Sequence, residues 1–434
     1  MLSRDDLLAS FPAGEKKLEA RAIGTEYEKL LRHYQTGLSI PWTGKYGIES
    51  VMRFFSDSFG WEPYEEEGII IALKRGTQSI TLEPGGQFEM SGAPLKTLRE
   101  VKAELDNHLE ELGAMSESFP IRVGWLGLNP AQTIDQVNWM PKPRYRTMRR
   151  YMPTVGKLGL GMMGLTCTVQ ANLDILSQED FAKKIKMGNG VGALVTALFA
   201  NSPIFAGQPS GFQSYRAHIW HHTDDARSGL RRFVFDTDAG YEDYIEWALD
   251  VPIYFVKRDG RYIDLAGKGT FRDLNVGRIS GHHAEPSDWQ LHLSTLFPDV
   301  RARPHLEFRH ADVVPPEAIV ALPALWKGLT YDEVACEAAW DLVKRWTWDE
   351  RERLSRDVAK DAIRASRPGA LGTILPLCSE LLDISAHGLS RQALRGEGEV
   401  DDVHYLDVLR EIVTSERTFA DRTLMAFDAA KTRT

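Results

Sequence analysis

GIIIALKRGTQSITLEPGGQFEM, residues 68–90, holds three short runs rich in β-branched and other apolar residues. An Arg-Gly pair at 75–76 separates the first two runs, and a Pro-Gly-Gly sequence at 84–86 separates the last two. Both separators are typical of tight turns, and short strands joined by tight turns pair in antiparallel fashion. The stretch therefore predicts a β-meander with strands at 68–74, 77–83 and 87–90.

Hydrophobic periodicity predicts the elements on both sides of this meander. Before the meander we expect an amphipathic helix over 2–20, an extended run over 21–31 and a core-packed helix over 45–59. After it we expect helices over 95–115 and 178–199, and strands over 121–128, 165–175, 251–257 and 305–309. The chain from 316 to 434 is mostly helical, with breaks near Pro368 and Gly396.

Strands gather in the first three quarters of the chain and helices dominate the last quarter. This distribution favours an α+β fold with an antiparallel or mixed sheet over regular βαβ alternation. A length of 434 residues fits one large enzyme body or two to three domains, and the sequence marks no clear domain boundary.

Composition excludes several classes of protein. Fifty-two basic residues against 61 acidic ones give a net charge of −9, which argues against a nucleic-acid binder. Three scattered cysteines are too few for a disulfide scaffold or a four-thiolate metal site. The acidic N-terminal segment does not resemble a targeting sequence, and the longest apolar run, 191–200, is too short to span a membrane. We therefore expect a cytoplasmic protein with reduced thiols.

Acidic residues in three segments suggest metal-dependent chemistry. In IGTEYEK (23–29), Glu26 and Glu28 are two residues apart and point to the same face of a strand. Glu83 and Glu89 stand at opposite ends of the Pro-Gly-Gly turn. Unpaired carboxylates on one face repel each other, and a divalent cation such as Mg²⁺ removes that cost. Alternatively, the first pair lies on a solvated strand face and Glu89 on an edge strand.

HLEFRHAD (305–312) places Glu307 and Arg309 on one face of another strand. Glu307 could hold a metal ion while Arg309 meets phosphate oxygens through its bidentate fork. A salt bridge within the strand is the alternative. In SYRAHIWHHTDD (214–225), Arg216 and the nearby aromatic Trp220 could bind the carboxylate of an amino acid.

Three other patterns carry little chemistry. The histidines at 218 and 222 have helical spacing, but no glutamate completes a zinc motif around them. Gly159 to Gly164 matches G-x-G-x-x-G, yet a strand rather than a helix is predicted to follow it. Cys167 has no adjacent base and is expected to be a packed, unreactive thiol.

Taken together and in order, these segments resemble the plant-type glutamate–cysteine ligase family, in its bacterial branch. The resemblance covers nearly the whole chain. It rests on blocks such as IGTEYEK, ITLEPGGQFEMSG, GWLGLNP, TCTVQANLD, ALDVPIYFV, HLSTLFPDVRARPHLEFRHAD and ALPALWKGLTYDE. It implies a glutamine-synthetase-like fold, in which a curved, mainly antiparallel sheet forms a funnel with helices packed outside. It also implies one catalytic domain over 1–434, with a helical C-terminal part over roughly 316–434.

The resemblance also implies roles for individual residues. It assigns two or three Mg²⁺ ions, bridging ATP, to Glu26, Glu28, Glu83, Glu89, Gln170 and Glu307. Arg309 would face the γ-phosphate of ATP and, with Glu26 and Glu28, carry the catalysis. Substrate glutamate would meet Arg216, Trp220 and Tyr254. The disulfide-based redox control of plant members is not expected with these three cysteines.

The implied reaction is ATP-dependent ligation of L-glutamate to L-cysteine through an acyl phosphate, giving γ-glutamylcysteine, ADP and phosphate. The implied partners are these three substrates, with neither nucleic acid nor membrane, and the implied assembly is a monomer or homodimer. Two alternatives stay open. One is the same activation chemistry with another acceptor amine, and the other is a non-catalytic nucleotide- or metal-binding module.

Overall fold

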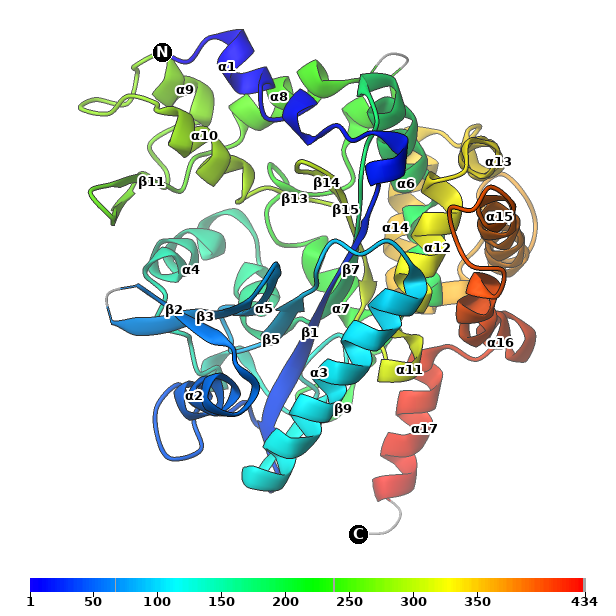
Figure 1. Ribbon diagram of the computed structural model, residues 1–434, viewed down its shortest axis with the longest axis horizontal. Helices are drawn as coiled ribbons and strands as arrows, with labels where there is room; N and C mark the ends of the chain where they lie inside the picture. The colour runs from blue at the N-terminus through cyan, green and yellow to red at the C-terminus, as the bar shows by residue number, and fades with distance from the viewer. Residues whose placement is uncertain (67, 237–238, 432–434) are drawn as a thin grey trace.

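The computed structural model describes residues 1–66, 68–236 and 239–431. Its centre is a large antiparallel sheet (Figure 1). Within the described residues the strands run in the order β14 (Val300–Ala302), β15 (Leu306–Asp312), β7 (Thr168–Leu173), β1 (Ile23–His33), β5 (Phe88–Ser91), β4 (Gln78–Leu82), β3 (Ile69–Arg75) and β2 (Glu62–Glu66). A ninth strand, β6 (Ile121–Gly124), pairs with the far end of β1. The sheet is open, with β14 and β2 at its edges.

Three small two-stranded sheets and many helices complete the fold. The small sheets pair β8 (Ile204–Phe205) with β9 (Gln208–Pro209), β10 (Ser228–Gly229) with β13 (Phe297–Pro298), and β11 (Phe255–Arg258) with β12 (Arg261–Asp264). The helices are α1 (Arg4–Leu8), α2 (Ile48–Phe59), α3 (Leu98–Ser118), α4 (Pro143–Val155), α5 (Gly159–Leu165), α6 (Gln178–Leu198), α7 (Tyr215–Trp220), α8 (Tyr241–Asp250), α9 (Phe271–Asn275), α10 (Pro286–Leu293), α11 (Pro316–Ile319), α12 (Ala321–Thr330), α13 (Glu333–Val343), α14 (Trp348–Asp361), α15 (Leu375–Leu394), α16 (Asp407–Ser415) and α17 (Phe419–Lys431).

The predicted meander is present as β3, β4 and β5, and β5 joins it to the central strand β1. The α+β prediction with a mainly antiparallel sheet is therefore confirmed. Strands 165–175 and 251–257 are shorter than predicted, and the 305–309 strand extends to Asp312. The helix predicted over 45–59 ends at Phe59 because Gly60, with φ +70°, adopts the left-handed conformation that ends a helix.

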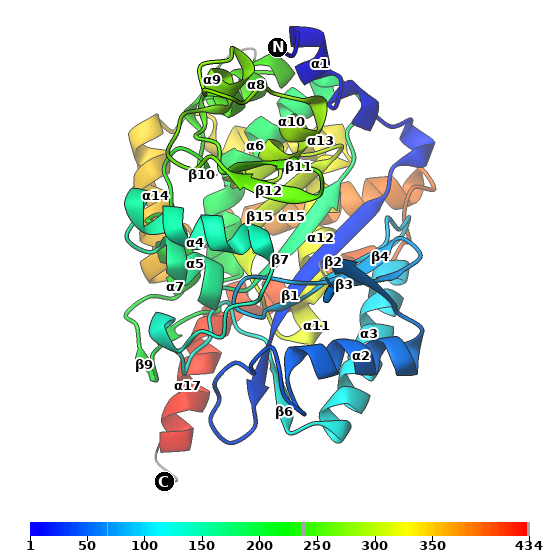
Figure 2. The same cartoon turned by 90° about the vertical axis from the view of Figure 1, so that its left-hand side faces the viewer.

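Strand alternation gives the sheet two different faces. Tyr27, Lys29 and Phe308 point to one face, where Trp326 of α12 stacks on Phe308 and the Lys29 amine contacts His108 of α3. Helices α3, α6 and α12 cover this face. The opposite face carries Glu26 and Glu28. In Figure 2, α4 and α5 lie on the viewer's side of β7 and β1, while α12 and α15 lie behind these strands.

The structure differs from the prediction at the N-terminus. The single helix expected over 2–20 is replaced by α1 and two 3₁₀ turns, at Pro12–Gly14 and Leu18–Ala20. Proline lacks the backbone N–H that a continuing helix requires. Gly14 also lies against the backbone of Pro304, where a Cβ would come within 2.5 Å of the Pro304 Cα. The N-terminal segment therefore turns to follow the β14–β15 hairpin.

Helices α4, α5 and α7 were not predicted from the sequence, although α4 and α5 form one wall of the site described below. α4 begins at Pro143 and holds Pro153 near its end, and α5 contains three glycines, so neither shows a clear helical pattern. From Pro316 onward the described chain is mostly helical, with non-helical stretches over 365–374 and 395–401. Among the described residues, no helix combines the length and apolar character needed to cross a bilayer.

Candidate active site

A cavity of about 330 Å³ lies between the carboxylate-bearing face of the sheet and helices α4 and α5. Its lining is strongly charged. The acidic residues that line it are Glu26, Glu28, Glu83 and Glu89, and the basic ones are Lys142, Arg144, Arg216, Arg301, Arg303 and Arg309. Such a mixture of convergent charges suits small, multiply charged ligands.

Strand register brings the acidic residues together. Glu28 on β1 pairs with Glu89 on β5, and Glu26 pairs with Gln170 on β7. Because side chains alternate along a strand, all four point to the same face. β5 lies between β1 and β4, so Glu89 is on an interior strand and the edge-strand alternative is wrong. Glu28 and Glu89 are each 9% exposed, which also excludes a solvated strand face for Glu28.

The carboxylates lie in an environment that disfavours their charge. Burial, and after it repulsion from Glu307 and Glu89, raises the pKa of Glu26 to about 8. Burial and then Glu89 raise the pKa of Glu28 well above its usual range. Burial and then Glu83 raise the pKa of Glu89. The protein therefore compensates the negative charge of these carboxylates only in part, and this favours a cation beside them.

Hydrogen bonds hold three of these carboxylates in place. Asn172 donates to Glu26 Oε1 at 3.0 Å, and the backbone N–H of Thr168 donates to Glu28 Oε2 at 2.9 Å. The Thr81 hydroxyl donates to Glu89 Oε2 at 2.6 Å. Each contact leaves at least one oxygen of the carboxylate available to a ligand.

The Pro-Gly-Gly turn positions Glu83 at the rim of the cavity. Gly86 has a φ of +84°, a conformation that favours glycine. A Cβ on Gly85 would lie 2.2 Å from the carbonyl oxygen of Gly164 on α5. Gly85 thus allows this turn to pack closely against the backbone of Gly164, the last glycine of the G-x-G-x-x-G pattern.

Glu307 is positioned differently from the other acidic residues. It is 1% exposed, and Arg301 donates to its Oε2 from Nε at 2.9 Å and from Nη2 at 2.6 Å. Arg309 bonds its Oε1 and also donates to Gln170 Oε1 at 2.6 Å. Burial alone would raise the pKa of Glu307, but the guanidiniums of Arg301 and Arg309 hold it below its usual range. The predicted salt-bridge alternative for Glu307 and Arg309 is therefore present in the structure.

Arg216 enters the cavity from α7 and is 4% exposed. Its Nη1 lies 3.8 Å from Asp312 Oδ1, and its Nη2 donates to the Arg309 carbonyl at 3.0 Å. Asp312 is itself held by the hydroxyls of Ser202 and Ser214. The Trp220 ring lies 5.9 Å from the Arg216 guanidinium and 5.7 Å from that of Arg309, so it lines the cavity beside both.

Tyr254 does not belong to the described lining of this cavity. Its ring packs under the guanidinium of Arg227 at 3.7 Å, and its hydroxyl lies 3.8 Å from the sulfur of Met152. The side chain is 1% exposed. Of the predicted substrate residues, the structure therefore brings Arg216 and Trp220 into the cavity and places Tyr254 in the core behind α4.

Sequence reasoning missed four basic lining residues. Lys142 and Arg144 come from the start of α4, and Arg301 and Arg303 come from the β14 hairpin. Burial lowers the pKa of Lys142 to about 8, although Glu83 opposes the shift, and its amine donates to the Leu82 carbonyl at 2.9 Å. The spacing of Arg301 and Arg303 by two residues in VRARPHLEFR is the sequence pattern from which these two could have been predicted to share a strand face.

The described residues contain no cluster of three or more His, Cys, Asp or Glu side chains close enough to form a complete metal site. The donor set in the cavity is nonetheless all oxygen. Mg²⁺ commonly takes only one or two protein carboxylates and completes its shell with phosphate oxygens and water, so this arrangement fits a nucleotide-bridged ion.

The three cysteines are buried, as expected. Burial raises the pKa of the Cys167 thiol well above its usual range. Cys167 packs between Leu30 and Val313, and it is not part of the cavity lining.

Comparison with known proteins decides the family. The family model described as glutamate-cysteine ligase family 2 matches residues 22–432. The chain belongs to this glutamate–cysteine ligase family. Its relatives include glutamate–cysteine ligase B, chloroplastic, of Oryza sativa subsp. japonica, which is 42% identical over 430 residues, 98% of this chain and 84% of the relative. The chloroplastic enzyme of Nicotiana tabacum is 42% identical over 417 residues, 95% of this chain and 78% of that protein.

A solved structure with a similar fold is also that of a glutamate–cysteine ligase. The crystal structure of glutamate–cysteine ligase from Francisella tularensis in complex with AMP superposes with a TM-score of 0.58 at 12% identity, covering 94% of this chain and 84% of that chain. At this identity the likeness concerns the fold alone. It agrees with the predicted ligase fold, while the family assignment rests on the sequence matches above.

Proposed function

We propose that this chain ligates the γ-carboxylate of L-glutamate to the amine of L-cysteine at the expense of ATP. The products are γ-glutamylcysteine, ADP and phosphate, and the reaction is the first step of glutathione biosynthesis. The observation that carries the proposal is the charged cavity, built from the segments that match the glutamate–cysteine ligase family. The AMP bound to the Francisella tularensis relative supports a nucleotide as one substrate.

The cavity suits this reaction because its chemistry is chiefly charge neutralisation and positioning. The γ-carboxylate of glutamate attacks the γ-phosphorus of ATP, and ADP leaves with the electrons of the broken P–O bond. The cysteine amine then attacks the acyl phosphate carbon, and phosphate leaves. Neither step requires a nucleophile from the protein, which agrees with the burial of Cys167.

Arg216 and Arg309 have distinct places in this scheme. Arg216, beside Trp220, binds a carboxylate of glutamate and orients the side-chain carboxylate toward the nucleotide. Arg309 faces the phosphoryl group being transferred and stabilises its negative charge. Glu307 and Gln170 fix the Arg309 guanidinium in this direction through the contacts described above.

Two or three Mg²⁺ ions complete the proposal. Glu26, Glu28, Glu83 and Glu89 would hold them, because these carboxylates line the cavity and three of them have raised pKa values. Bound Mg²⁺ would supply positive charge to the triphosphate. Glu307 and Gln170 already accept hydrogen bonds from Arg309, so they fit the role of positioning Arg309 better than that of primary metal ligands.

A product assay tests the proposal. Purified protein is incubated with glutamate, cysteine, ATP and Mg²⁺, each is omitted in turn, and both γ-glutamylcysteine and phosphate are measured. We expect both products only with the complete mixture. Phosphate release without both amino acids, or preference for a thiol-free amine over cysteine, would contradict the assignment. Cytoplasmic location remains a prediction that cell fractionation tests.

A further inference from the structure

The β14–β15 hairpin brings three arginines to one wall of the cavity. Arg301 lies on β14, Arg303 at its end and Arg309 on β15, and all three line the cavity. Arg301 pairs with Glu307 across the two strands, and Arg309 bonds the other oxygen of the same carboxylate. Both oxygens of the Glu307 carboxylate are thus hydrogen-bonded to these two guanidiniums, and neither bonds the third arginine.

Arg303 is the third. Its backbone closes the hairpin by donating to the His305 carbonyl at 2.8 Å. In the part of the chain that the structure describes, no hydrogen bond or ion pair engages its side chain. Its strongest electrostatic neighbour is Arg301, a like charge, which with burial lowers the pKa of Arg303. The half-buried Arg303 side chain therefore lines the cavity with no hydrogen-bond or ion-pair partner among the described residues.

The composition of this wall indicates what Arg303 binds. A lone substrate carboxylate needs one guanidinium fork, and Arg216 on α7 already offers one. Three guanidiniums side by side fit a ligand with several anionic oxygens, for which phosphates are the best match among the three substrates. Glu26 faces the same wall, since its charge also acts on Arg303. A polyphosphate would thus contact both the arginines and the carboxylates that favour cations.

We propose that Arg303 is a nucleotide-binding residue that donates to oxygens of the β- or γ-phosphate of ATP. The inference rests on the proposed function and adds to it a residue and the part of the substrate that this residue contacts. AMP lacks both of these phosphates, so its binding affinity should not depend on Arg303. Neither should the binding of glutamate or cysteine.

The test measures ATP and AMP dissociation constants by calorimetry in the presence of Mg²⁺, and KM for each amino acid. Losing charge-assisted hydrogen bonds to phosphate should raise the ATP dissociation constant of Arg303→Gln by about 10- to 100-fold. Arg303→Lys, which keeps the charge but loses the fork, should show a smaller rise. AMP affinity and the KM for both amino acids should stay within about twofold of wild type.

Arg146→Gln is the matched control, because Arg146 is an exposed arginine of α4 outside the cavity lining. The thermal unfolding temperature of Arg303→Gln should not fall below that of wild type, since the Arg303 guanidinium has no described hydrogen bond or ion pair to lose. If Arg303→Gln does not fold, the same test is made with Arg303→Lys, whose ATP and AMP dissociation constants are compared with those of wild type. Unchanged ATP affinity, an equal loss of AMP affinity, or a loss confined to an amino acid would overturn the inference. Wild-type protein that neither binds ATP nor forms γ-glutamylcysteine would instead overturn the proposed function.

Discussion

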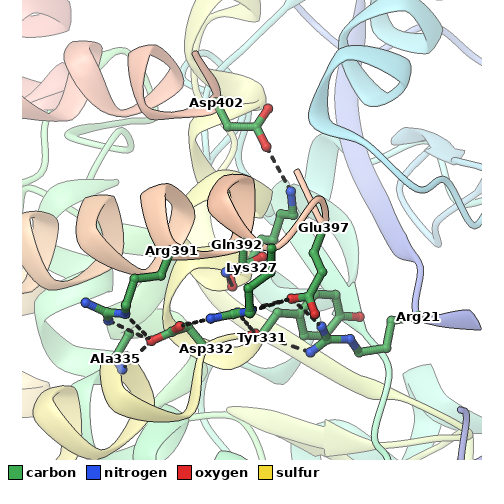
Figure 3. A network of polar contacts seen from close by, with 10 residues as sticks. Arg21, Lys327, Tyr331, Asp332, Ala335, Arg391, Gln392, Glu397 and Asp402 are labelled. Atoms are coloured by element: carbon green, nitrogen blue, oxygen red, sulfur yellow. Dashed lines mark hydrogen bonds and ion pairs between the residues drawn. The ribbon is translucent and has the colours of Figure 1, made fainter. Parts of the chain in front are cut away.

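Two regions of this molecule bury charged side chains, and they do so in opposite ways. In the C-terminal helical layer, Lys327 contacts Asp402 at 2.8 Å with both side chains at most 2% exposed (Figure 3). Beside them, Asp332 accepts from Arg391 and Arg395, and Glu397 from Arg21. Each of these cations therefore has a carboxylate partner. In the cavity, by contrast, only Glu307 is paired, with Arg301 and Arg309, among the described acidic residues of this site; Glu26, Glu28 and Glu89 lie near other carboxylates, and Arg303 lies near other arginines.

The paired charges of the C-terminal layer stabilise the fold, whereas the unpaired charges of the cavity are suited to binding a ligand. A buried ion pair with complete hydrogen bonding is self-contained, and breaking it leaves an uncompensated charge. A group of like charges in a cavity raises the energy of the ligand-free protein and is stabilised when a ligand of opposite charge binds. Substitutions in the two regions should accordingly affect different quantities.

The largest expected effect is on stability. Asp402→Ala leaves the Lys327 amine buried without its carboxylate, and it should lower the free energy of unfolding by about 3–5 kcal/mol. Denaturant titration measures this loss. The double variant Lys327→Met/Asp402→Leu should recover most of it. An Asp402→Ala protein as stable as wild type would show that the pair is not self-contained.

In the cavity the expected loss is in activity. Glu28→Gln keeps the shape of the side chain but removes its charge, and it should reduce kcat/KM by about 100-fold, or ~2.7 kcal/mol, by weakening charge neutralisation at the triphosphate. Stability should not fall, because burial already disfavours the Glu28 charge. Glu110→Gln, at an exposed position on α3, is the matched control. A Glu28→Gln enzyme with full activity would remove Glu28 from the site.

The raised pKa of Glu26 predicts a pH dependence of stability. The pKa of Glu26 is raised from 4.5 to about 8, so between these values the unfolded chain has lost a proton that the folded protein keeps. Stability of the metal-free protein should therefore fall as pH rises through this window, by about 1 kcal/mol per pH unit relative to Glu26→Gln. Unfolding of both proteins from pH 4.5 to 8 measures the difference. If the free energy of unfolding changed with pH in the same way in both proteins, the raised pKa of Glu26 would be contradicted.

The smallest effect is expected at the edge of the paired network. Arg395 is 43% exposed, and Asp332 keeps Arg391 and the backbone N–H of Ala335 when Arg395 is replaced. Arg395→Gln should cost only about 0.5 kcal/mol of stability, with activity unchanged. Thermal unfolding with an activity assay checks both. A loss as large as that of Asp402→Ala would mean that the network acts as one unit.

The sequence predicted the parts of the site that follow strand periodicity. Spacing by two placed Glu26 with Glu28 and Glu307 with Arg309 on shared faces, because side chains alternate between the two faces of a regular strand. Periodicity could not show that Arg301 reaches Glu307, since β14 is only three residues long and its pairing depends on the hairpin. Nor could it predict the α4 wall, where prolines obscure the helical pattern.

Other differences arise from tertiary packing. The N-terminal helix was expected from its amphipathic pattern, but Pro12 and the close approach of Gly14 to Pro304 prevent it. The resemblance assigned Tyr254 to the substrate pocket, and in the structure its ring packs against the Arg227 guanidinium in the core. The C-terminal polar network joins residues more than 300 positions apart, such as Arg21 and Glu397, and no local pattern predicts such a pair.

The central claim is that the cavity carboxylates hold divalent cations at the triphosphate. Binding of Mn²⁺, a paramagnetic substitute for Mg²⁺, measured by electron paramagnetic resonance with ATP present, tests it most directly. We predict at least two ions bound per wild-type chain, and fewer in the Glu26→Gln/Glu28→Gln double variant. Equal numbers of bound ions in the two proteins would contradict the account.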